Sequence, residues 1–212
     1  KWVQEPDLSK WGIDVQATQP YILADDWECR TREPVDDIHI FGSWLGDRLP
    51  FNQQGLPDPT AVSFTLSIHS DIPDPDGPGP DYSRPGPVIW QRQYAPGTFK
   101  AWPFEAQLSE GWLRPPGQWQ PLADTICWQY DFVLPRREFI QEGTEQNPVI
   151  YWLDVQATPQ DPDAVFGWKT SLWHWNDDAV WGMGAEPYLG PWSELRYPPG
   201  HMMHPGSIDL AF

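Results

Sequence analysis

Apolar and polar side chains alternate along several stretches of the chain, a period of two that indicates β-strands with one buried face. The alternation is clearest in residues 62–69, 126–134 and 149–156. Shorter candidates are residues 22–29, 35–44, 88–94, 164–169 and 207–212. In the first stretch, Phe64, Leu66 and Ile68 are expected to face the core, whereas Ser67 and His69 face outward. The pattern therefore predicts about eight strands.

Proline, glycine and aspartate dominate the segments between these stretches, and they favour turns over helices. Only residues 137–145 have a composition that suits a short helix. Many strands joined by turn-rich loops are typical of all-β proteins, so we expect a single domain over residues 1–212 that forms an antiparallel, jelly-roll-like β-sandwich. A closed barrel is the alternative. Residues 71–86 are expected to form a loop that extends away from the sandwich.

The chain is strongly acidic, with 30 Asp and Glu against 13 Lys and Arg and a formal net charge of −17. A field of that sign repels nucleic-acid phosphates and anionic lipid surfaces. The chain also has no apolar run of about 18 residues, the length that spans a membrane as a helix. We therefore expect no nucleic-acid partner and no membrane insertion. The sequence begins Lys1-Trp2-Val3 without a methionine, which is expected of a mature secreted or cell-surface protein.

Two cysteines, Cys29 and Cys127, lie far apart and belong to no Cys-x-x-Cys or Cys/His pattern. This spacing excludes a zinc ribbon or a thioredoxin-type motif. In an extracellular protein the two residues can pair in one long-range disulfide. The alternative is two separate buried thiols.

Tryptophan is unusually abundant, with 15 residues in the chain, and five of them fall between residues 166 and 192. Indole faces stack on the C–H faces of sugar rings, while neighbouring carboxylates, amides and imidazoles can bond to the hydroxyl groups. An acidic protein is compatible with a neutral polysaccharide. The alternative is that these tryptophans fill the core. The residues expected to bind a glycan are Trp173, His174, Trp175, Asp177, Asp178 and Trp181.

Paired aspartates in turn-rich segments suit Ca²⁺, which takes six to eight oxygen ligands. The expected calcium ligands are Asp25, Asp26, Asp74 and Asp76. Asp74-Pro75-Asp76-Gly77 resembles the start of an EF-hand loop, but no Glu stands at its twelfth position, so an EF-hand is excluded. A structural calcium site and plain solvated acidic loops both remain open.

The histidines offer a weaker metal signal. His39 and His69 are expected on outward positions of strands, where neighbouring strands would bring the imidazoles together. His201-Met202-Met203-His204 combines imidazole with thioether, which suits copper. Surface histidines without a metal are the alternative. The Gly-x-Ser-x-Gly, His-Glu-x-x-His, Walker and dinucleotide-binding motifs are all absent from the sequence.

Several phrases occur in a fixed order along nearly the whole chain. They are residues 23–27 (LADDW), 38–44 (IHIFGSW), 64–71 (FTLSIHSD), 151–155 (YWLDV) and 209–212 (DLAF). Together they resemble an uncharacterised family of Trp-rich domains in secreted bacterial proteins, which a C-terminal sorting segment often follows. The resemblance implies a secreted β-sandwich and no particular activity.

These observations favour a secreted β-sandwich that binds a neutral polysaccharide without catalysis. One alternative is a self-associating subunit of an extracellular surface, matrix or filament, in which tryptophans make protein contacts. The other is an extracellular polysaccharide-active enzyme that depends on copper or calcium. No catalytic residue is assigned.

Overall fold

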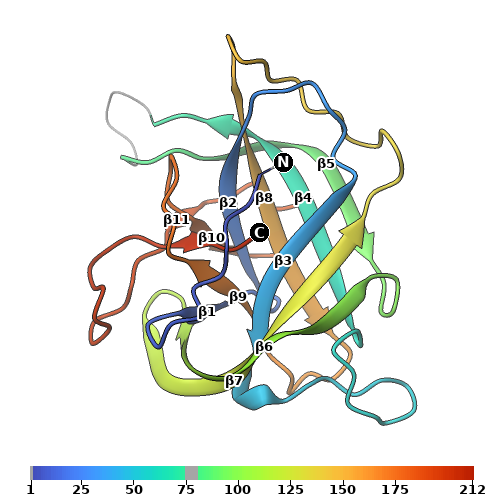
Figure 1. Ribbon diagram of the computed structural model, residues 1–212, viewed down its shortest axis with the longest axis vertical. Helices are drawn as coiled ribbons and strands as arrows, with labels where there is room; N and C mark the ends of the chain where they lie inside the picture. Colours follow the sequence, from blue (N-terminus) through green and yellow to red (C-terminus); the bar gives the residue numbers. More distant parts are fainter. Residues whose placement is uncertain (1, 75–80) are drawn as a thin grey trace.

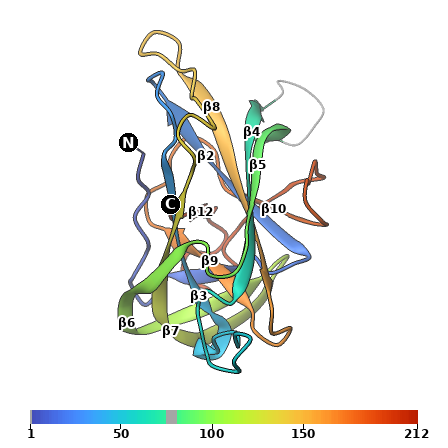
Figure 2. The ribbon, with the colours of Figure 1, turned by 90° about the vertical axis from the view of Figure 1, so that its right-hand side faces the viewer.

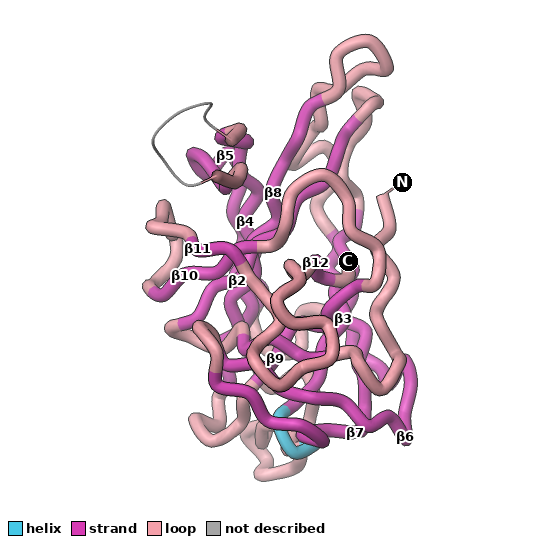
Figure 3. The backbone as a smooth tube through the Cα atoms, turned by 90° about the vertical axis from the view of Figure 1, so that its left-hand side faces the viewer, coloured by secondary structure: helices cyan, strands magenta, loops and turns pink. Residues whose placement is uncertain are grey.

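The structure of the protein, a computed structural model, describes residues 2–74 and 81–212. These residues form twelve strands in two sheets. Their one helical segment is the short 3-10 turn η1 (Leu45–Asp47), cyan in Figure 3. Residues 137–145, where a short helix was expected, form turns and extended chain instead. None of the described segments is a helix long and apolar enough to cross a membrane.

The first sheet closes on itself. Its strands, in spatial order, are β1 (Ile13–Gln16), β6 (Lys100–Arg114), β7 (Gln118–Val133), β3 (Asp37–Trp44), β9 (Phe166–Ser171) and β12 (Asp209–Leu210). Because β1 pairs with β9 as well as with β6, five of these strands form a ring, and β12 is attached to it through β9. The long strands β6 and β7 curve around the lower end of the molecule (Figures 1 and 2).

The second sheet is open and antiparallel throughout. Its strands, in spatial order, are β11 (Ser193–Glu194), β10 (Val180–Met183), β2 (Tyr21–Cys29), β8 (Val149–Pro159), β4 (Val62–Ile72) and β5 (Arg84–Tyr94). The strands β2, β8 and β4 run side by side along the length of the molecule (Figure 1). Residues 71–86 include the end of β4 and the start of β5, so the connection between these strands is shorter than expected.

The prediction of an all-β fold is confirmed, and all eight expected stretches contain a strand. The antiparallel sandwich is not confirmed, because the first sheet closes into a five-stranded barrel and its β1–β6 pair is parallel. The eight stretches do not include β1, β6, β10 and β11, although the pentapeptide that residues 14–18 share with residues 154–158 of β8 indicates a strand at β1. Three of these are four residues or shorter, and β6 carries Pro103 and a long exposed run without alternation.

The two sheets share one hydrophobic cluster, with Phe64 of β4 near its centre. Its ring packs against four aromatic rings at centroid distances of 5.0 to 5.4 Å: Phe99, Tyr130, Phe132 and Phe166. Three of these lie on β7 or β9 of the first sheet. Aromatic edge-to-face contacts of this kind add to the free energy of burial. The alternating apolar residues of β4 therefore bind the second sheet to the barrel.

The opposite face of β4 and β8 is also buried, which corrects the expectation that His69 faces solvent. His69 Nε2 lies 2.6 Å from Asp154 Oδ2 and Nδ1 lies 2.8 Å from the carbonyl of Gly86, and the His69 and Asp154 side chains are fully buried. Tyr188 and Trp192, from the chain after β10, pack over this face. Alternation separates the two faces of a strand, but it does not show whether another segment covers the polar one.

The two cysteines are free, buried thiols on different sheets. Cys29 ends β2 and donates to the carbonyl of Thr31 at 2.9 Å, and Cys127 lies on β7. Burial raises the pKa of the Cys127 thiol well above its usual value. Of the two alternatives from the sequence, the structure agrees with separate buried thiols.

We expect Phe64→Ala to lower the free energy of unfolding by about 3–5 kcal/mol, because it removes a buried ring and leaves a cavity between the two sheets. Urea unfolding followed by tryptophan fluorescence measures the change. Val133→Ala, at a position that is 69% exposed, is the control and should change stability by less than about 0.5 kcal/mol. Equal losses in the two variants would show that Phe64 is not central to the core.

Candidate functional site

The chain between β9 and β10, residues 172–179, forms a loop whose polar groups bond to β2 and β12. The backbone N–H of Trp175 donates to Asp209 Oδ2 at 2.8 Å. Asn176 Nδ2 donates to Asp26 Oδ2 at 2.6 Å, and its positive φ of 57° is one that Asn tolerates well. These bonds hold the polar side chains of the loop against two strands that are distant in the sequence.

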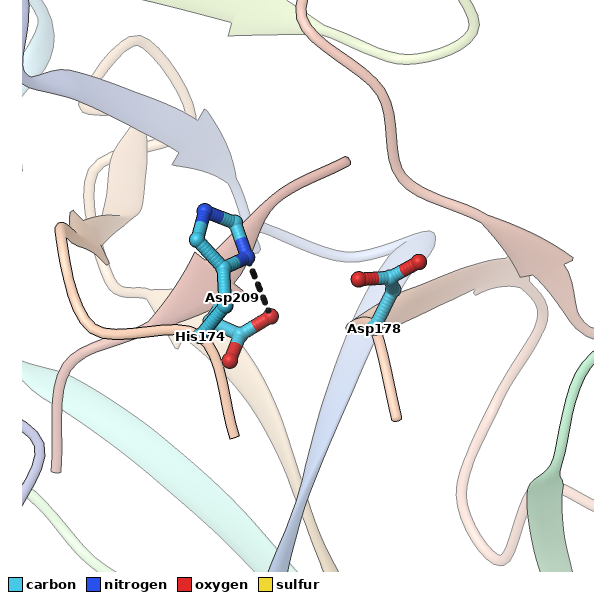
Figure 4. A group of neighbouring side chains, drawn as sticks. All are labelled: His174, Asp178 and Asp209. Atoms are coloured by element: carbon cyan, nitrogen blue, oxygen red, sulfur yellow. Dashed lines mark hydrogen bonds and ion pairs between the residues drawn. The ribbon is translucent and has the colours of Figure 1, made fainter. Parts of the chain in front are cut away.

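His174, Asp178 and Asp209 gather at this point, and we call them the acidic site (Figure 4). His174 Nδ1 lies 3.1 Å from Asp209 Oδ1. One ligand atom from each of the three residues lies within 4.8 Å of the other two. In Figure 4 the Asp178 carboxylate lies across a gap from the His174–Asp209 pair. One imidazole and two carboxylates at this spacing have the chemistry and the geometry to hold a divalent cation.

Asp26 of β2 borders the acidic site through its bond to Asn176 of the loop. Burial raises its pKa to about 8; the hydrogen bond from Asn176 opposes this shift, and the charges of Asp177, Asp209 and Asp71 add to it. Asp26 is fully buried, and its Oδ1 accepts no hydrogen bond from any residue that the structure describes. A buried carboxylate oxygen without a partner is costly, so a proton or a cation is expected to satisfy it.

The pKa values of His174 and Asp209 in the acidic site are also raised. For His174 the first cause is the hydrogen bond to Asp209, which favours the protonated imidazole. For Asp209 the first cause is burial, which the contact with His174 partly offsets. Both shifts are upward, so Asp209 and His174 each hold a proton more tightly in the folded protein than they would in a solvated peptide.

Asp25, next to Asp26, has a structural role instead. Its Oδ2 accepts hydrogen bonds from Gln4 Nε2 at 3.0 Å and from the backbone N–H of Leu210 at 2.6 Å. Its Oδ1 accepts the backbone N–H of Asp26 at 2.8 Å. Asp25 therefore ties the first and last segments of the chain to β2, and its oxygens are already used within the protein.

A cleft of about 530 Å³ opens where β2 ends and β3 begins. Its aromatic wall consists of Trp2, Trp27 and Phe212, and Trp27 Nε1 donates to Gln141 Oε1 at 2.9 Å on the same wall. The polar residues that line the cleft are Glu28, Arg30, Thr31, Glu33, Asp36, Asp37, His39 and Gln141. A volume of a few hundred cubic ångströms with aromatic walls and several polar groups is typical of small-molecule sites.

The two chain ends form part of this cleft and connect it to the loop after β9. Gln4 and Phe212 exchange backbone hydrogen bonds at 2.9 and 3.1 Å, so the ends of the chain lie side by side (Figures 1 and 3). The ring of Trp2 meets that of Trp175 edge to face with centroids 4.5 Å apart. A continuous aromatic surface therefore runs from the cleft to the acidic site.

Of the six residues expected to bind a glycan, five lie in the loop after β9, and Trp181 does not. Trp173 is 68% exposed and Trp175 is half-buried against Trp2. Trp181 lies on β10, where it packs on the main core and faces the ring of Tyr21 at 6.3 Å. The loop also brings the expected glycan ligands His174, Asp177 and Asp178 close to Asp26, an expected calcium ligand.

The expected pairs of histidines do not form. His39 lies on β3 beside Asp131, in a different sheet from His69, so the two imidazoles are not cross-strand neighbours. His201 Nε2 donates to the carbonyl of Trp11 at 3.0 Å, and His204 Nδ1 donates to that of Tyr197 at 2.8 Å. The groups of possible metal ligands found among residues 2–74 and 81–212 include none of these four histidines.

Of the other expected calcium ligands, Asp74 does not join the acidic site. The backbone N–H of Asp74 donates to Ser83 Oγ at 3.0 Å, in the connection from β4 to β5, and Asp76 lies outside the described residues. Four residues of the acidic site and the cleft were not expected from the sequence: Trp2, Trp27, Asp209 and Phe212. Asp209 begins a strand of two residues, and the ends of the chain carry no local signal of a shared wall, so only the fold shows their roles.

The fold and these two features define an all-β domain with an aromatic cleft next to an acidic site. The chain belongs to the family described as Domain of unknown function (DUF7901), which matches residues 1–212. The resemblance to an uncharacterised family is thereby confirmed. No curated protein and no solved structure gives a significant match to the chain.

We expect the melting temperature to fall as the pH rises from 5 to 8 in the presence of a chelator. Asp26, and Glu186 beside His69 and Asp154, have pKa values of about 8, raised first by burial. A carboxyl group with a raised pKa binds its proton more tightly in the folded state, so stability falls between the unfolded pKa near 4 and the folded value. Differential scanning calorimetry across this pH range measures the effect.

Asp26→Asn should flatten this pH dependence, because the amide is neutral at every pH and can still accept the bond from Asn176. Asp163→Asn, at an exposed position, is the matched control and should leave the slope as in the wild type. A melting temperature that rises from pH 5 to pH 8 would contradict the assignment of buried protonated carboxyl groups.

Proposed function

We propose that this protein binds a neutral polysaccharide in the cleft between β2 and β3. The observation that carries the proposal is the aromatic wall of Trp2, Trp27 and Phe212 facing a cleft of about 530 Å³. Rings at a cleft wall offer flat apolar faces to sugar C–H groups. Secretion or display at the cell surface, which the family resemblance implies, would bring the protein into contact with such polymers.

The polar lining supports the same ligand class. Gln141, Arg30 and His39 offer hydrogen-bond donors, and Glu28 and Asp36 offer acceptors. Sugars carry hydroxyl groups that both donate and accept, so a mixed set of this kind suits them. The net charge of −17 disfavours polyanions such as acidic glycans.

The loop after β9 extends the proposed site. Trp173 is largely exposed, and Trp175 meets Trp2 at the edge of the cleft. A polymer has more rings than the cleft encloses, so a second aromatic surface along its path adds contacts. We propose binding without catalysis, and no residue is assigned a catalytic role.

We expect Trp2→Ala and Trp175→Ala each to weaken polysaccharide binding about tenfold, equivalent to about 1.4 kcal/mol, because each removes a ring from the aromatic surface. Pull-down with cellulose and chitin, and affinity electrophoresis in xylan and β-glucan, measure binding. Both variants should melt within a few degrees of the wild type, since both rings are only partly buried.

Trp11→Ala is the matched control. Trp11 is half-exposed, its ring lies near His201 and Lys10, and it does not line the cleft. This variant should bind as the wild type does. Retention of none of the four polysaccharides, or equal binding by the wild type and Trp2→Ala, would contradict the proposal.

We also propose that the acidic site holds a structural Ca²⁺ ion. Asp178 and Asp209 would supply carboxylate oxygens, which outnumber the single imidazole of His174. Asp26, which bonds to Asn176 of the same loop, adds a carboxyl group with an unpartnered Oδ1 beside this set. A bound cation would neutralise these groups and fix the loop that carries Trp173 and Trp175. The ion would thus position one part of the proposed glycan surface.

Millimolar Ca²⁺ should raise the melting temperature above its value in excess chelator, because an ion that binds only the folded state stabilises it by mass action. At about 100 times the dissociation constant the gain is about 2.7 kcal/mol, or about 5–10 °C in a chain of this size. Asp178→Asn should reduce the increase and Asp163→Asn should not. An equal melting temperature in Ca²⁺ and in chelator would contradict a calcium site, and an increase with Zn²⁺ alone would assign the site to zinc.

A further inference from the structure

Four charged side chains converge inside the ring of five strands. They are Asp14 of β1, Glu110 of β6, Asp124 of β7 and Lys169 of β9. Lys169, Asp14 and Glu110 are fully buried, and Asp124 is 2% exposed. Neither the cleft nor the acidic site includes them, so the proposed function leaves this cluster unexplained.

Lys169 and Asp14 are direct cross-strand partners in the antiparallel pair of β9 and β1. Lys169 Nζ lies 3.0 Å from Asp14 Oδ2, one bond from the carboxyl carbon. On its other side Nζ lies 2.5 Å from Glu110 Oε1. Three strands of the closed ring therefore hold the amine of Lys169 within reach of the carboxyl groups of Asp14 and Glu110.

The surroundings exclude water and leave no room for the groups to separate. Trp112 is 3% exposed and its ring closes on Gly167, where an added Cβ would lie 2.7 Å from the indole and 2.9 Å from the Cβ of Asp14. Reacting groups that are held in a fixed orientation react faster, because the entropy of bringing them together has already been lost on folding. The absence of bulk water also favours loss of water over hydrolysis.

Asp14, Glu110 and Asp124 are close enough together to hold a metal ion, with one oxygen from each within 4.8 Å of the others. The ammonium group of Lys169 already contacts Asp14 and Glu110, so a metal ion would have to displace it. Reaction between the amine and a carboxyl group uses the observed contacts as they stand.

We propose that Lys169 and Asp14 join in an intramolecular isopeptide bond, with Glu110 as the group that transfers the protons. Glu110 accepts a proton from the Lys169 ammonium, and the neutral Nζ attacks Cγ of the protonated Asp14 carboxyl group. The N–Cγ bond forms and one C–O bond breaks. Glu110 returns this proton to the departing hydroxyl, which leaves as water, and then takes the excess proton of the nitrogen, so that the amide, one water and a protonated Glu110 remain. The reaction is a condensation and needs no oxidant or cofactor.

Burial lowers the pKa of Lys169, but the charges of Asp14 and Glu110 raise it by more, so the amine becomes neutral only when its proton passes to Glu110. The carboxyl groups fit the proposed roles. Burial raises the pKa of Asp14, an effect that Lys169 opposes, and a protonated carboxyl group is the better electrophile. The pKa of Glu110 is about 7, raised first by burial and then by the charge of Asp14. A group with a pKa near neutrality can both accept and return a proton. Asp124, with a pKa of about 9, also raised first by burial, remains protonated beside Glu110.

The bond would connect β1, near the start of the chain, to β9. It would close a covalent loop between residues 155 positions apart and lock the pairing that completes the ring. A cross-link of this kind lowers the conformational entropy of the unfolded chain, as a disulfide does, but it requires no cysteine. It would suit a protein whose two cysteines remain free.

The intact mass of the folded wild-type protein, measured after denaturation, decides whether the bond forms. We expect a mass below that of the sequence by one molecule of water. Trypsin should then yield residues 11–30 joined to residues 138–196, because cleavage after a modified Lys169 is blocked. Fragmentation should place the linkage between Asp14 and Lys169. A full sequence mass, or a loss of water located elsewhere, would overturn the proposal.

Glu110→Gln tests the transfer of protons, with Glu110→Ala as a second variant if the first does not fold. Each folded variant should retain the full sequence mass and lack the joined peptide. Glu105→Gln makes the same change at an exposed position of β6 and should form the bond as the wild type does. A joined peptide in a Glu110 variant would overturn the role of Glu110. Circular dichroism confirms that each variant is folded.

Discussion

The pairing of β1 with β9 is the constraint on which the rest of the structure depends. It closes five strands into a ring and sets Asp14 opposite Lys169 inside that ring. Strand β9 also pairs with β12 in the register Asp209 to Ser171, where the loop after β9 begins. Strand β9 thus positions the buried cluster around Lys169 through its pairing with β1. Through its pairing with β12 it also positions Asp209 of the acidic site.

In each sheet an aspartate of a repeated pentapeptide forms a buried ion pair. The sequence Asp-Val-Gln-Ala-Thr occurs at residues 14–18 and 154–158. Asp14 pairs with Lys169, and Asp154 pairs with His69, in each case between fully buried side chains. Val15 and Val155 face the shared hydrophobic cluster. Such pairs are costly to bury and costlier to break, so they specify the strand register more than they add stability.

The two ends of the chain join the proposed functional surfaces to each other. Backbone bonds between Gln4 and Phe212 bring Trp2 and Phe212 to the same cleft, and Asp25 fastens both segments to β2. Trp2 then contacts Trp175 of the loop that carries His174 and Asp178. A ligand in the cleft and a cation in the acidic site would therefore act on adjoining parts of one surface.

The sequence by itself determined eight of the twelve strands and the composition of the loop after β9. Alternation located eight strands, and the density of tryptophan and aspartate singled out His174, Asp177 and Asp178, because both signals are local. Only the tertiary structure decided that the first sheet closes, that the polar face with His69 is covered, and that Asp26 meets the loop while Asp74 does not. Ring closure depends on β1, a strand of four residues with one parallel partner, and short strands carry almost no periodicity. The cleft needs both ends of the chain in one place. The side chains of Trp2 and Phe212 carry no local signal of a neighbour about 200 residues away, and only the backbone bonds between Gln4 and Phe212 bring them together.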